Sequence, residues 1–273
     1  MWRQVVIAAA AALAFSGCGG VAGTADEAKP DKVQVVVVGD SLIEPENGCP
    51  VGCTGFVEQF TDHVASTLGS EAEYQIVPSG GLPDALEAVS KPGPEADKIA
   101  AADVVVVQVG FNNALPDPET GIGCKTWFLD TEPECLAEGV KTYGGLYDQV
   151  FAGVKALRGD KPTVFVATTT IDGNISPAQA FPDGLLALYA SSGRKKEAKE
   201  WAVAAYDRWN TMLTERATAA GFQVIDLYHA VNGADGTQST YPAFSDDGAH
   251  PSQAGNDLVA AKLAEADLSP IDK

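Results

Sequence analysis

One serine follows an apolar, β-branched run closely enough to suggest covalent chemistry. Ser41 comes just after the run Val33–Val38, within the letters GDSL. The run predicts a buried strand, so we expect Ser41 at the carboxyl end of that strand, where a glycine lets the backbone turn. A serine exposed there can act as a nucleophile when a base reaches it, although Gly-Asp-Ser is also a common turn.

Two histidines are candidates for the base, because an aspartate precedes each of them by three residues. The pairs are Asp226 with His229 and Asp247 with His250. A carboxylate that accepts the N–H of one ring nitrogen leaves the other nitrogen for a serine hydroxyl. Asp226 directly follows the last predicted strand, whereas Asp247 lies in a loop that can fold over the sheet edge. We therefore predict that His250, held by Asp247, is the base for Ser41.

Two more predicted strands end in residues that can bind negative charge. Asn112 follows the strand Asp103–Val109, and its uncharged amide can donate to an oxyanion or, alternatively, brace the loop that follows. Gly80 and Gly81 follow the strand Tyr74–Val77, where we expect a backbone N–H that no side chain shields. We predict Gly80 as the donor, with Gly81 as the competing choice.

The segments around these residues predict an α/β fold. Five short apolar runs suit strands that are buried on both faces: Val33–Val38, Tyr74–Val77, Asp103–Val109, Thr163–Ala167 and Phe222–Ile225. Helical stretches separate and follow them: Gly55–Leu68, Pro83–Val89, Leu136–Leu157, Lys195–Ala220 and Ser252–Glu265. This alternation predicts a three-layer α/β/α fold with a five-stranded parallel sheet. Parallel strands end at one edge, so the candidate residues are expected to meet there.

The composition is that of a globular protein with an acidic surface. The 273 residues are 45% hydrophobic, which is enough for one sizeable core. No long linker divides residues 33–273, which we expect to form a single, monomeric domain. Lys and Arg number 18 against 37 Asp and Glu, for a formal charge of -19. This charge argues against nucleic acid and anionic lipid surfaces as partners.

The first residues predict export. Val5–Phe15 is an uninterrupted apolar run, too short to span a bilayer, and a serine, a glycine and Cys18 follow it. Small residues before a cysteine resemble the lipobox of bacterial lipoproteins. This resemblance implies a signal peptide over residues 1–17, a lipid anchor to the membrane on Cys18, and a flexible tether over residues 18–32. Phe15 stands where that motif usually has an aliphatic residue, which leaves ordinary cleavage and a secreted protein open.

Four further cysteines form an even set, which predicts two disulfides in an exported protein: Cys49, Cys53, Cys124 and Cys135. Four cysteines allow three connectivities, and the short separations favour Cys49 with Cys53 and Cys124 with Cys135. A zinc site is the alternative, but this spacing is not a usual metal pattern and no histidine lies near either pair. We therefore predict no metal site.

Four of the candidate residues, in chain order, closely resemble the signature residues of the SGNH hydrolases, also called the GDSL esterase/lipase family: Ser41, Gly80, Asn112 and His250. The resemblance runs from Val33 to Leu263 and rests on three sequence blocks, VVVVGDSL, VGFNN and DGAHPSQAG. Two features depart from the family pattern. Asn113 replaces an acidic residue in the second of these blocks, and the asparagine often found upstream of Gly80 is absent. The resemblance implies a flavodoxin-like arrangement of the sheet and helices.

The resemblance also implies an ester hydrolase that works through an acyl-enzyme and needs no cofactor, and the predicted signal peptide makes it an exported one. Ser41 would attack the ester carbonyl while His250, held by Asp247, takes the serine proton. The N–H groups of Ser41 and Gly80 and the Asn112 amide would meet the oxyanion. Two alternatives stay open: a cell-envelope O-acyltransferase with the same residues, and a non-catalytic binding lipoprotein. The acidic surface favours a small or glycan-linked acyl ester over a phospholipid.

Overall fold

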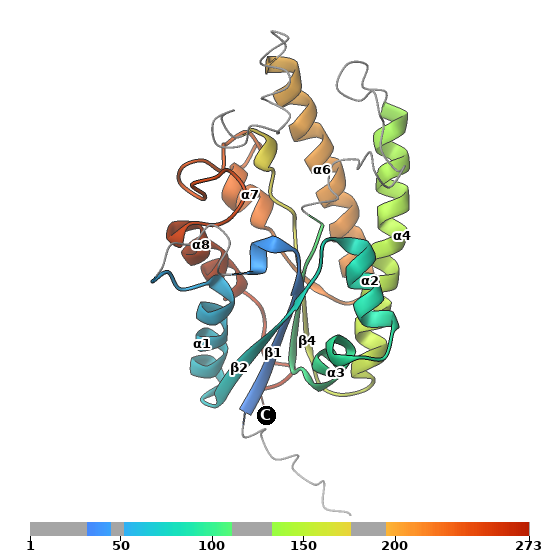
Figure 1. Ribbon diagram of the computed structural model, residues 1–273, viewed down its shortest axis with the longest axis vertical. Helices are drawn as coiled ribbons and strands as arrows, with labels where there is room; N and C mark the ends of the chain where they lie inside the picture. Colours follow the sequence, from blue (N-terminus) through green and yellow to red (C-terminus); the bar gives the residue numbers. More distant parts are fainter. Residues whose placement is uncertain (1–31, 45–51, 111–132, 176–194, 273) are drawn as a thin grey trace, which may run out of the picture.

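A parallel sheet of five strands lies at the centre of the computed structural model, which describes residues 32–44, 52–110, 133–175 and 195–272 (Figure 1). The strands are β1 (Lys32–Gly39), β2 (Glu71–Pro78), β3 (Val104–Gln108), β4 (Val164–Thr168) and β5 (Gln223–Ile225). They lie in the order β2-β1-β3-β4-β5, and every pair of neighbours is parallel. The predicted five-stranded parallel sheet is confirmed.

Two runs of valine make the middle of the sheet. Val35–Val38 of β1 pairs with Val104–Val107 of β3, and all of these side chains are buried. β-Branched side chains fit a pleated surface, and helices cover both faces, so neither run alternates with polar residues. β1 begins at Lys32, the last residue of the predicted tether, because the backbone of Lys32 already pairs with Glu71 of β2.

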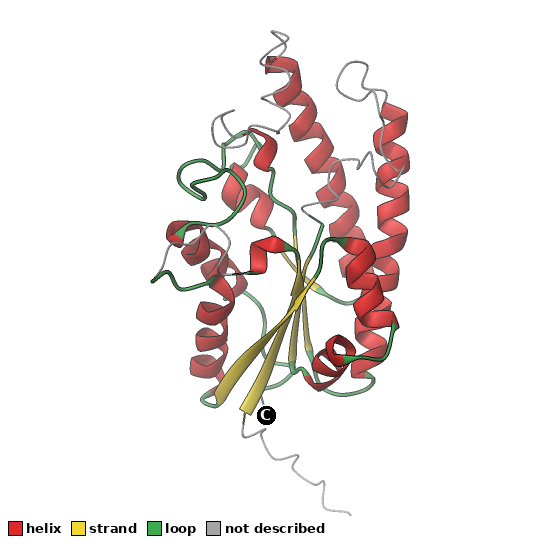
Figure 2. Cartoon of the chain, viewed as in Figure 1, coloured by secondary structure: helices red, strands yellow, loops and turns green. Residues whose placement is uncertain are grey.

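Helices cover both faces of the sheet and give the three layers that the sequence predicts (Figure 2). One face is covered by α1 (Phe56–Leu68) and α8 (Gln253–Leu263). The other face is covered by α2 (Leu82–Ser90), α3 (Pro94–Ala101), α4 (Pro133–Arg158) and α6 (Lys195–Ala219). One more helix, α7 (Leu227–Asn232), directly follows β5 at the carboxyl edge of the sheet.

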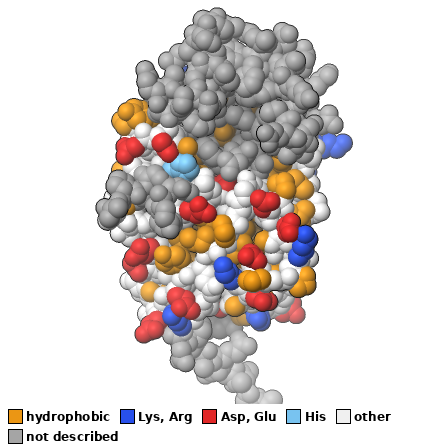
Figure 3. All heavy atoms as spheres, in the orientation of Figure 1, with side chains coloured by type: hydrophobic (Ala, Val, Ile, Leu, Met, Phe, Trp, Pro, Cys, Tyr) orange, Lys and Arg blue, Asp and Glu red, His pale blue; other side chains and the backbone are white. Residues whose placement is uncertain are grey.

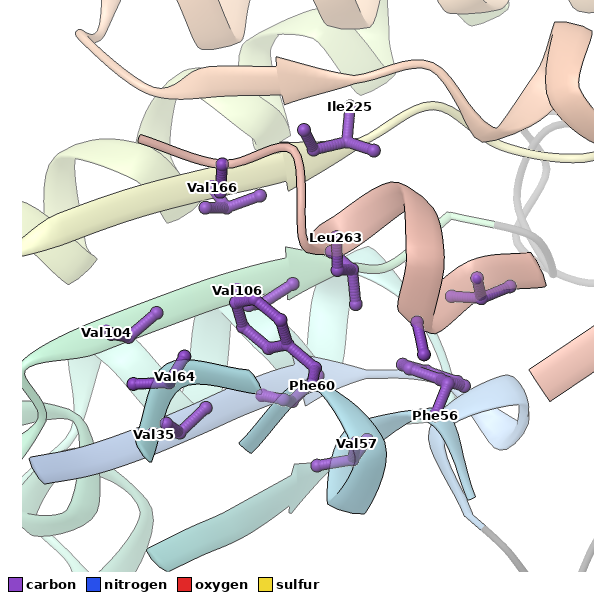
Figure 4. Close-up of a cluster of buried hydrophobic side chains, with 14 of the residues drawn as sticks. Val35, Phe56, Val57, Phe60, Val64, Val104, Val106, Val166, Ile225 and Leu263 are labelled. Atoms are coloured by element: carbon purple, nitrogen blue, oxygen red, sulfur yellow. The ribbon is translucent and has the colours of Figure 1, made fainter. Parts of the chain in front are cut away.

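A continuous apolar cluster anchors α1 and α8 to the sheet (Figure 4). Phe60 and Val64 of α1 and Leu263 of α8 belong to the same buried cluster as Val35 and Val104 of the central strands, and all five are fully buried. Burying a side chain of this size stabilises the fold by about 1.5–3 kcal/mol relative to leaving it in water. The buried cluster therefore holds the sheet and its carboxyl edge in a fixed position.

Two short helices were not predicted from the sequence. α3 begins at Pro94, after Gly93, and α7 begins after Asp226, whose side chain accepts the N–H of His229. Each is too short for a helical period to stand out in the sequence. α7 is relevant to the site because it holds one of the two candidate aspartate–histidine pairs. Asp226 lies just before the helix, and His229 lies within it.

The surface carries many carboxylates. Figure 3 shows acidic side chains spread over one face of the molecule, in keeping with the formal charge of -19. An approaching anion therefore meets a negative potential. Within the described ranges, no helix combines the length and the apolar character that a membrane crossing requires.

Candidate active site

Ser41 lies at the carboxyl end of β1, where it begins the 3-10 helix η1 (Ser41–Ile43). A glycine must come before this turn. A Cβ on Gly39 would lie 2.6 Å from the carbonyl oxygen of Gln108 on β3 and 2.5 Å from Cγ2 of Ile43. Because Gly39 has no side chain, the chain can pass close to β3 and leave the sheet sharply. The strand and the glycine thus hold Ser41 at the sheet edge.

Asp40 fixes this turn from inside the protein, a role that sequence reasoning missed. The residue is only 1% exposed. Its carboxylate accepts the N–H of Leu42 at 3.5 Å and the N–H of Gly110 at 3.2 Å. The two contacts tie the turn after β1 to the end of β3. The preference of aspartate for the position before a helical turn is the sequence signal that could have indicated this role.

His250 lies beside Ser41, although 209 positions separate the two residues in the sequence. The Nε2 atom of His250 is 3.1 Å from Oγ of Ser41, and its Nδ1 atom is 2.6 Å from Oδ2 of Asp247. Both distances are within hydrogen-bond range. The structure thus brings together the three residues that the sequence predicts as nucleophile, base and orienting carboxylate. In this order, the ring can take the serine proton while the carboxylate stabilises the resulting imidazolium.

Asp247 is held in one orientation by its own loop. Its Oδ1 atom accepts the N–H of Ala249 at 2.8 Å, the N–H of His250 at 2.7 Å and the hydroxyl of Ser245 at 2.8 Å. Burial alone would raise the pKa of Asp247, but these bonds and the bond to the His250 ring outweigh burial and lower the pKa to about 2. The carboxylate is therefore ionised at neutral pH and favours a proton on Nδ1 of the ring.

Two buried hydroxyls shape the loop that carries His250. Ser245 accepts the N–H of Gly248 at 2.7 Å, and Thr240 donates to the carbonyl oxygen of Gly248 at 2.7 Å. Both hydroxyl-bearing residues are fully buried. Sequence reasoning missed them, and the only available signal was that a serine shortly before an aspartate and a glycine is typical of a tight turn.

A side chain shields the N–H of Gly80, contrary to the expectation that none would, while the role of Gly80 as an oxyanion donor stays a prediction. That N–H donates to Oδ2 of Asp84 at 2.8 Å. Asp84 lies in the first turn of α2, and carboxylates are favoured at this position because they accept N–H groups near the start of a helix. A Cβ on Gly80 would lie 2.6 Å from the same oxygen, so the glycine is what lets the carboxylate approach the backbone.

A pocket of about 610 Å³ opens beside the serine. The described residues that line it are Ser41, Glu44, Pro78, Ser79, Gly80, Asp84 and Glu87. Three of these side chains are carboxylates, and one of them, Glu87, forms an exposed ion pair with Lys91 at 2.8 Å. A cavity of this volume is in the usual range for a small-molecule site.

Several predicted residues lie outside the described part of the chain. These are Asn112, Cys18, Cys49, Cys124 and the side chain of Cys135, together with the predicted signal peptide and most of the tether. Cys53 is described and is disulfide-bonded, while both predicted cysteine pairings stay predictions. Among the described residues, no cluster of three or more His, Cys, Asp or Glu side chains could hold a metal ion.

The competing pair, Asp226 and His229, forms a dyad of the same kind at the end of β5. Nδ1 of His229 is 2.6 Å from Oδ2 of Asp226, and the backbone N–H of His229 donates to Oδ1 at 3.1 Å. Burial alone would raise the pKa of Asp226, but hydrogen bonds from His229 and Thr169 outweigh burial and lower the pKa. No described group bonds Nε2 of His229, and Ser41 lies beside His250 instead.

Comparison with known proteins gives one family and several similar folds. The sequence model of the GDSL-like lipase/acylhydrolase family matches residues 37–258, from within β1 into α8. No curated protein matches the chain in sequence.

Two solved structures illustrate the likeness in fold. The chain is similar to the lipase Lip_vut3 from a goat rumen metagenome, with 18% identity, a TM-score of 0.63 and coverage of 86% of this chain and 98% of that one. It is also similar to an acetyl xylan esterase from Geobacillus stearothermophilus, with 17% identity, a TM-score of 0.51 and coverage of 88% and 94%. At these identities the structures support the fold, whereas the family match spans most of the chain, Ser41 and His250 included. The chain therefore belongs to the GDSL-like lipase/acylhydrolase family and is a carboxylic ester hydrolase of that family.

Proposed function

We propose that the protein is an exported serine hydrolase that cleaves small or glycan-linked acyl esters through an acyl-enzyme. One observation carries the proposal: two hydrogen bonds, of 3.1 and 2.6 Å, run from Ser41 through His250 to Asp247. They lie beside a pocket of about 610 Å³ that Ser41 lines. A serine hydroxyl with a base in hydrogen-bond reach, and with an ionised carboxylate behind that base, is the arrangement that nucleophilic catalysis requires.

The first half of the proposed reaction acylates the serine. Oγ of Ser41 forms a bond to the ester carbonyl carbon as Nε2 of His250 takes the hydroxyl proton, which gives a tetrahedral intermediate. The bond to the alcohol oxygen then breaks, and the imidazolium gives its proton to the departing alcohol. Asp247 stabilises the positive ring, because its lowered pKa keeps the carboxylate charged throughout.

The second half of the reaction releases the acid. A water molecule takes the place of the alcohol, gives a proton to Nε2 of His250 and attacks the acyl carbon. Collapse of this second intermediate breaks the bond to Oγ and returns the proton to Ser41. The ring acts as a base in both halves of the reaction, and it returns to its starting state at the end of the cycle.

The oxyanion of both intermediates needs donors that are in place before attack. We assign the N–H of Ser41 and the side-chain amide of Asn112 to this role. The N–H of Gly80 can join them when Asp84 releases it, because that N–H already donates to the Asp84 carboxylate. Gly81 stays the competing donor.

The charge of the pocket supports the substrate part of the proposal. Three carboxylates line it, so an ester that carries a negative charge would be repelled. Fatty-acid anions and anionic headgroups are therefore poor fits, and small acyl esters or acylated glycans are better ones.

The N-terminal sequence supports the export part of the proposal. Its short apolar run is followed by Cys18, which we propose to be the site of a lipid anchor that holds the domain at the cell surface. Fractionation tests this. The chain should be found in the membrane fraction, a Cys18→Ser variant should be found in the soluble fraction, and an unchanged distribution would contradict the anchor.

Hydrolysis of a p-nitrophenyl ester series, from acetate to palmitate, tests the proposed activity. The purified domain should hydrolyse the short esters fastest, and Ser41→Ala should remove the signal. Ser66→Ala, at an exposed position in α1, is the matched control and should retain full activity. Equal rates for the Ser41→Ala variant and the wild type would contradict the assignment of the nucleophile. A preference for palmitate would contradict the proposed substrate class.

A further inference from the structure

We propose that Asp84 makes the pocket beside Ser41 selective for ester substrates that carry a positive charge. The selectivity rests on the proposed ester hydrolysis at Ser41. It concerns esters in which the acid or the alcohol bears an ammonium group.

The position of Asp84 is the first reason. Asp84 lines the same pocket as Ser41 and Gly80, from the first turn of α2. A substrate whose carbonyl carbon lies against Ser41 and which fills this pocket would contact the same lining as Asp84. The charge of the Asp84 carboxylate therefore acts on the part of the substrate that fills the pocket.

The fixed orientation of the carboxylate is the second reason. The N–H of Gly80 donates to Oδ2 of Asp84 at 2.8 Å and so restrains the side chain. Gly80 is its only hydrogen-bond partner among the described residues, and no described lysine or arginine pairs with it. An ionised carboxylate can accept about four hydrogen bonds, so one N–H leaves Oδ1 available to a ligand cation.

The surrounding charge is the third reason. Glu44 and Glu87 line the pocket with Asp84, and no basic side chain is among the described lining residues. Lys91 forms an ion pair with Glu87, whereas Asp84 has no counterion among the described residues. A substrate cation would supply that counterion.

Charge near the reacting atoms makes the effect larger in the transition state than in the ground state. The Asp84 carboxylate accepts the N–H of Gly80, which is one of the donors proposed for the oxyanion, so its negative charge would lie near the developing oxyanion. The Asp84 carboxylate and the oxyanion are both negative and therefore repel each other. A cation on the substrate pairs with Asp84 and reduces this repulsion, so a cationic ester should gain in kcat as well as in KM.

Matched pairs of esters isolate the charge. On the acid side, p-nitrophenyl 4-(trimethylammonio)butanoate is compared with p-nitrophenyl 5,5-dimethylhexanoate, which has the same shape and leaving group but no charge. On the alcohol side, acetylcholine, the acetate ester of choline, is compared with 3,3-dimethylbutyl acetate. Each kcat/KM is divided by the rate of uncatalysed hydrolysis of the same ester.

The wild type should prefer the cationic member of at least one pair by about three- to tenfold at low salt, a size that suits a solvent-exposed ion pair. High salt should reduce the preference, because it screens exposed charges. Asp84→Asn keeps an oxygen that can accept the Gly80 N–H but loses the charge, and it should reduce the preference to about one. Asp62→Asn, at an exposed position in α1, removes one negative charge elsewhere and should leave the preference unchanged.

Hydrolysis of p-nitrophenyl acetate by the same samples separates the two proposals. If Ser41-dependent hydrolysis of the acetate is present but neither pair favours the cation, or if Asp84→Asn retains the preference, the charge selectivity is wrong and the ester hydrolase stands. If no ester is hydrolysed, the proposed function fails, and the charge selectivity that rests on it fails too.

Discussion

Two aspartate–histidine dyads lie at the carboxyl edge of the sheet, and they are built almost alike. The loop dyad is Asp247 with His250, and the strand dyad is Asp226 with His229. In each, the ring Nδ1 atom is 2.6 Å from Oδ2 of the aspartate. In each, the backbone N–H of the histidine also donates to Oδ1, at 2.7 Å in the loop dyad and 3.1 Å in the strand dyad.

The similarity extends to the groups around the carboxylates. A hydroxyl donates to Oδ1 in both dyads, from Ser245 in the loop dyad and from Thr169 in the strand dyad. In both, hydrogen bonds outweigh the effect of burial and lower the pKa of the aspartate. The hydrogen bonds inside the two dyads therefore do not show which histidine can act as a base.

The two dyads differ in what lies beyond the ring. Nε2 of His250 is 3.1 Å from Ser41, and the His250 side chain is 27% exposed, against 46% for His229. Ser41 follows β1, whereas the strand dyad follows β5, three strand positions away along the sheet (Figure 1). At about 4.8 Å per strand this is roughly 14 Å, which is beyond the reach of a histidine side chain.

The D-x-x-H spacing orients a histidine through local hydrogen bonds alone. An aspartate that accepts the N–H of the third residue along is common at the start of a helix or turn, and the ring then lies close to the same carboxylate. The spacing therefore yields an oriented histidine wherever it occurs. Whether that histidine can serve as a base depends on a partner from a distant part of the chain.

Replacing the histidines should separate the dyads most strongly. His250→Ala should lower kcat/KM for p-nitrophenyl acetate by about 10³-fold or more, because it removes the base. His229→Ala should leave kcat/KM within about threefold of the wild type. Similar losses in the two variants, with both shown to be folded by circular dichroism, would refute the distinction.

Removing the carboxylate charge should give the next largest contrast. Asp247→Asn should lower kcat by about 10²- to 10⁴-fold, since the neutral amide no longer stabilises the imidazolium and allows the wrong tautomer. Asp226→Asn is the matched variant and should change kcat little. Steady-state kinetics of both at neutral pH checks this, and a large loss in Asp226→Asn alone would reverse the assignment of the two dyads.

Removing the supporting hydroxyls should affect stability in both dyads but activity in one. Ser245→Ala and Thr169→Val should each reduce the free energy of unfolding by about 1–3 kcal/mol, because each removes a hydrogen bond to a charged group. Only Ser245→Ala should also lower kcat, by about tenfold, since Asp247 is then less well oriented. Urea unfolding and kinetics measure the two effects, and an unchanged kcat in Ser245→Ala would show that Asp247 does not need this hydroxyl.

Acid should remove a contribution that the dyads share. The pKa of Asp247 is lowered from its ordinary 3.8 to about 2, so its ionisation stabilises the folded chain above pH 3.8, and this stabilisation disappears as the pH falls towards 2. The stability difference between the wild type and Asp247→Asn should therefore shrink over that interval. The stability difference between the wild type and Asp226→Asn should also shrink on acidification, because the pKa of Asp226 is lowered too. Urea midpoints measured from pH 7 to pH 2 check this, and a difference that grows on acidification would contradict it.

The sequence predicts the sheet well because its strands are strong local signals. The valine runs of β1 and β3 have few alternatives to a buried strand, and the long helices carry a clear apolar face. α3 and α7 were missed because a helix of two turns leaves almost no periodic pattern. The same strand ends also predict which edge of the sheet carries Ser41.

The sequence could not predict how side chains near Ser41 would pair. The Asp84 carboxylate accepts the N–H of Gly80, and the Ser245 hydroxyl donates to Asp247. Both hydrogen bonds depend on side-chain rotamers and on the geometry of short turns. Several donors and acceptors compete for each such partner, and spacing alone does not rank them. The preference for His250 over His229 rests on a different basis: a loop before a terminal helix can fold back over the sheet edge, whereas a strand end cannot move along it. In the structure, His250 lies beside Ser41.

Covalent labelling shows whether the long-range contact between His250 and Ser41 activates one serine. The protein is treated with a fluorophosphonate probe, and the adduct is located by intact mass and peptide mapping. We expect one adduct, on Ser41, that forms at the wild-type rate in His229→Ala and at least about 10²-fold more slowly in His250→Ala. An adduct on another serine, or labelling of Ser41 that depends on His229 and not on His250, would contradict it.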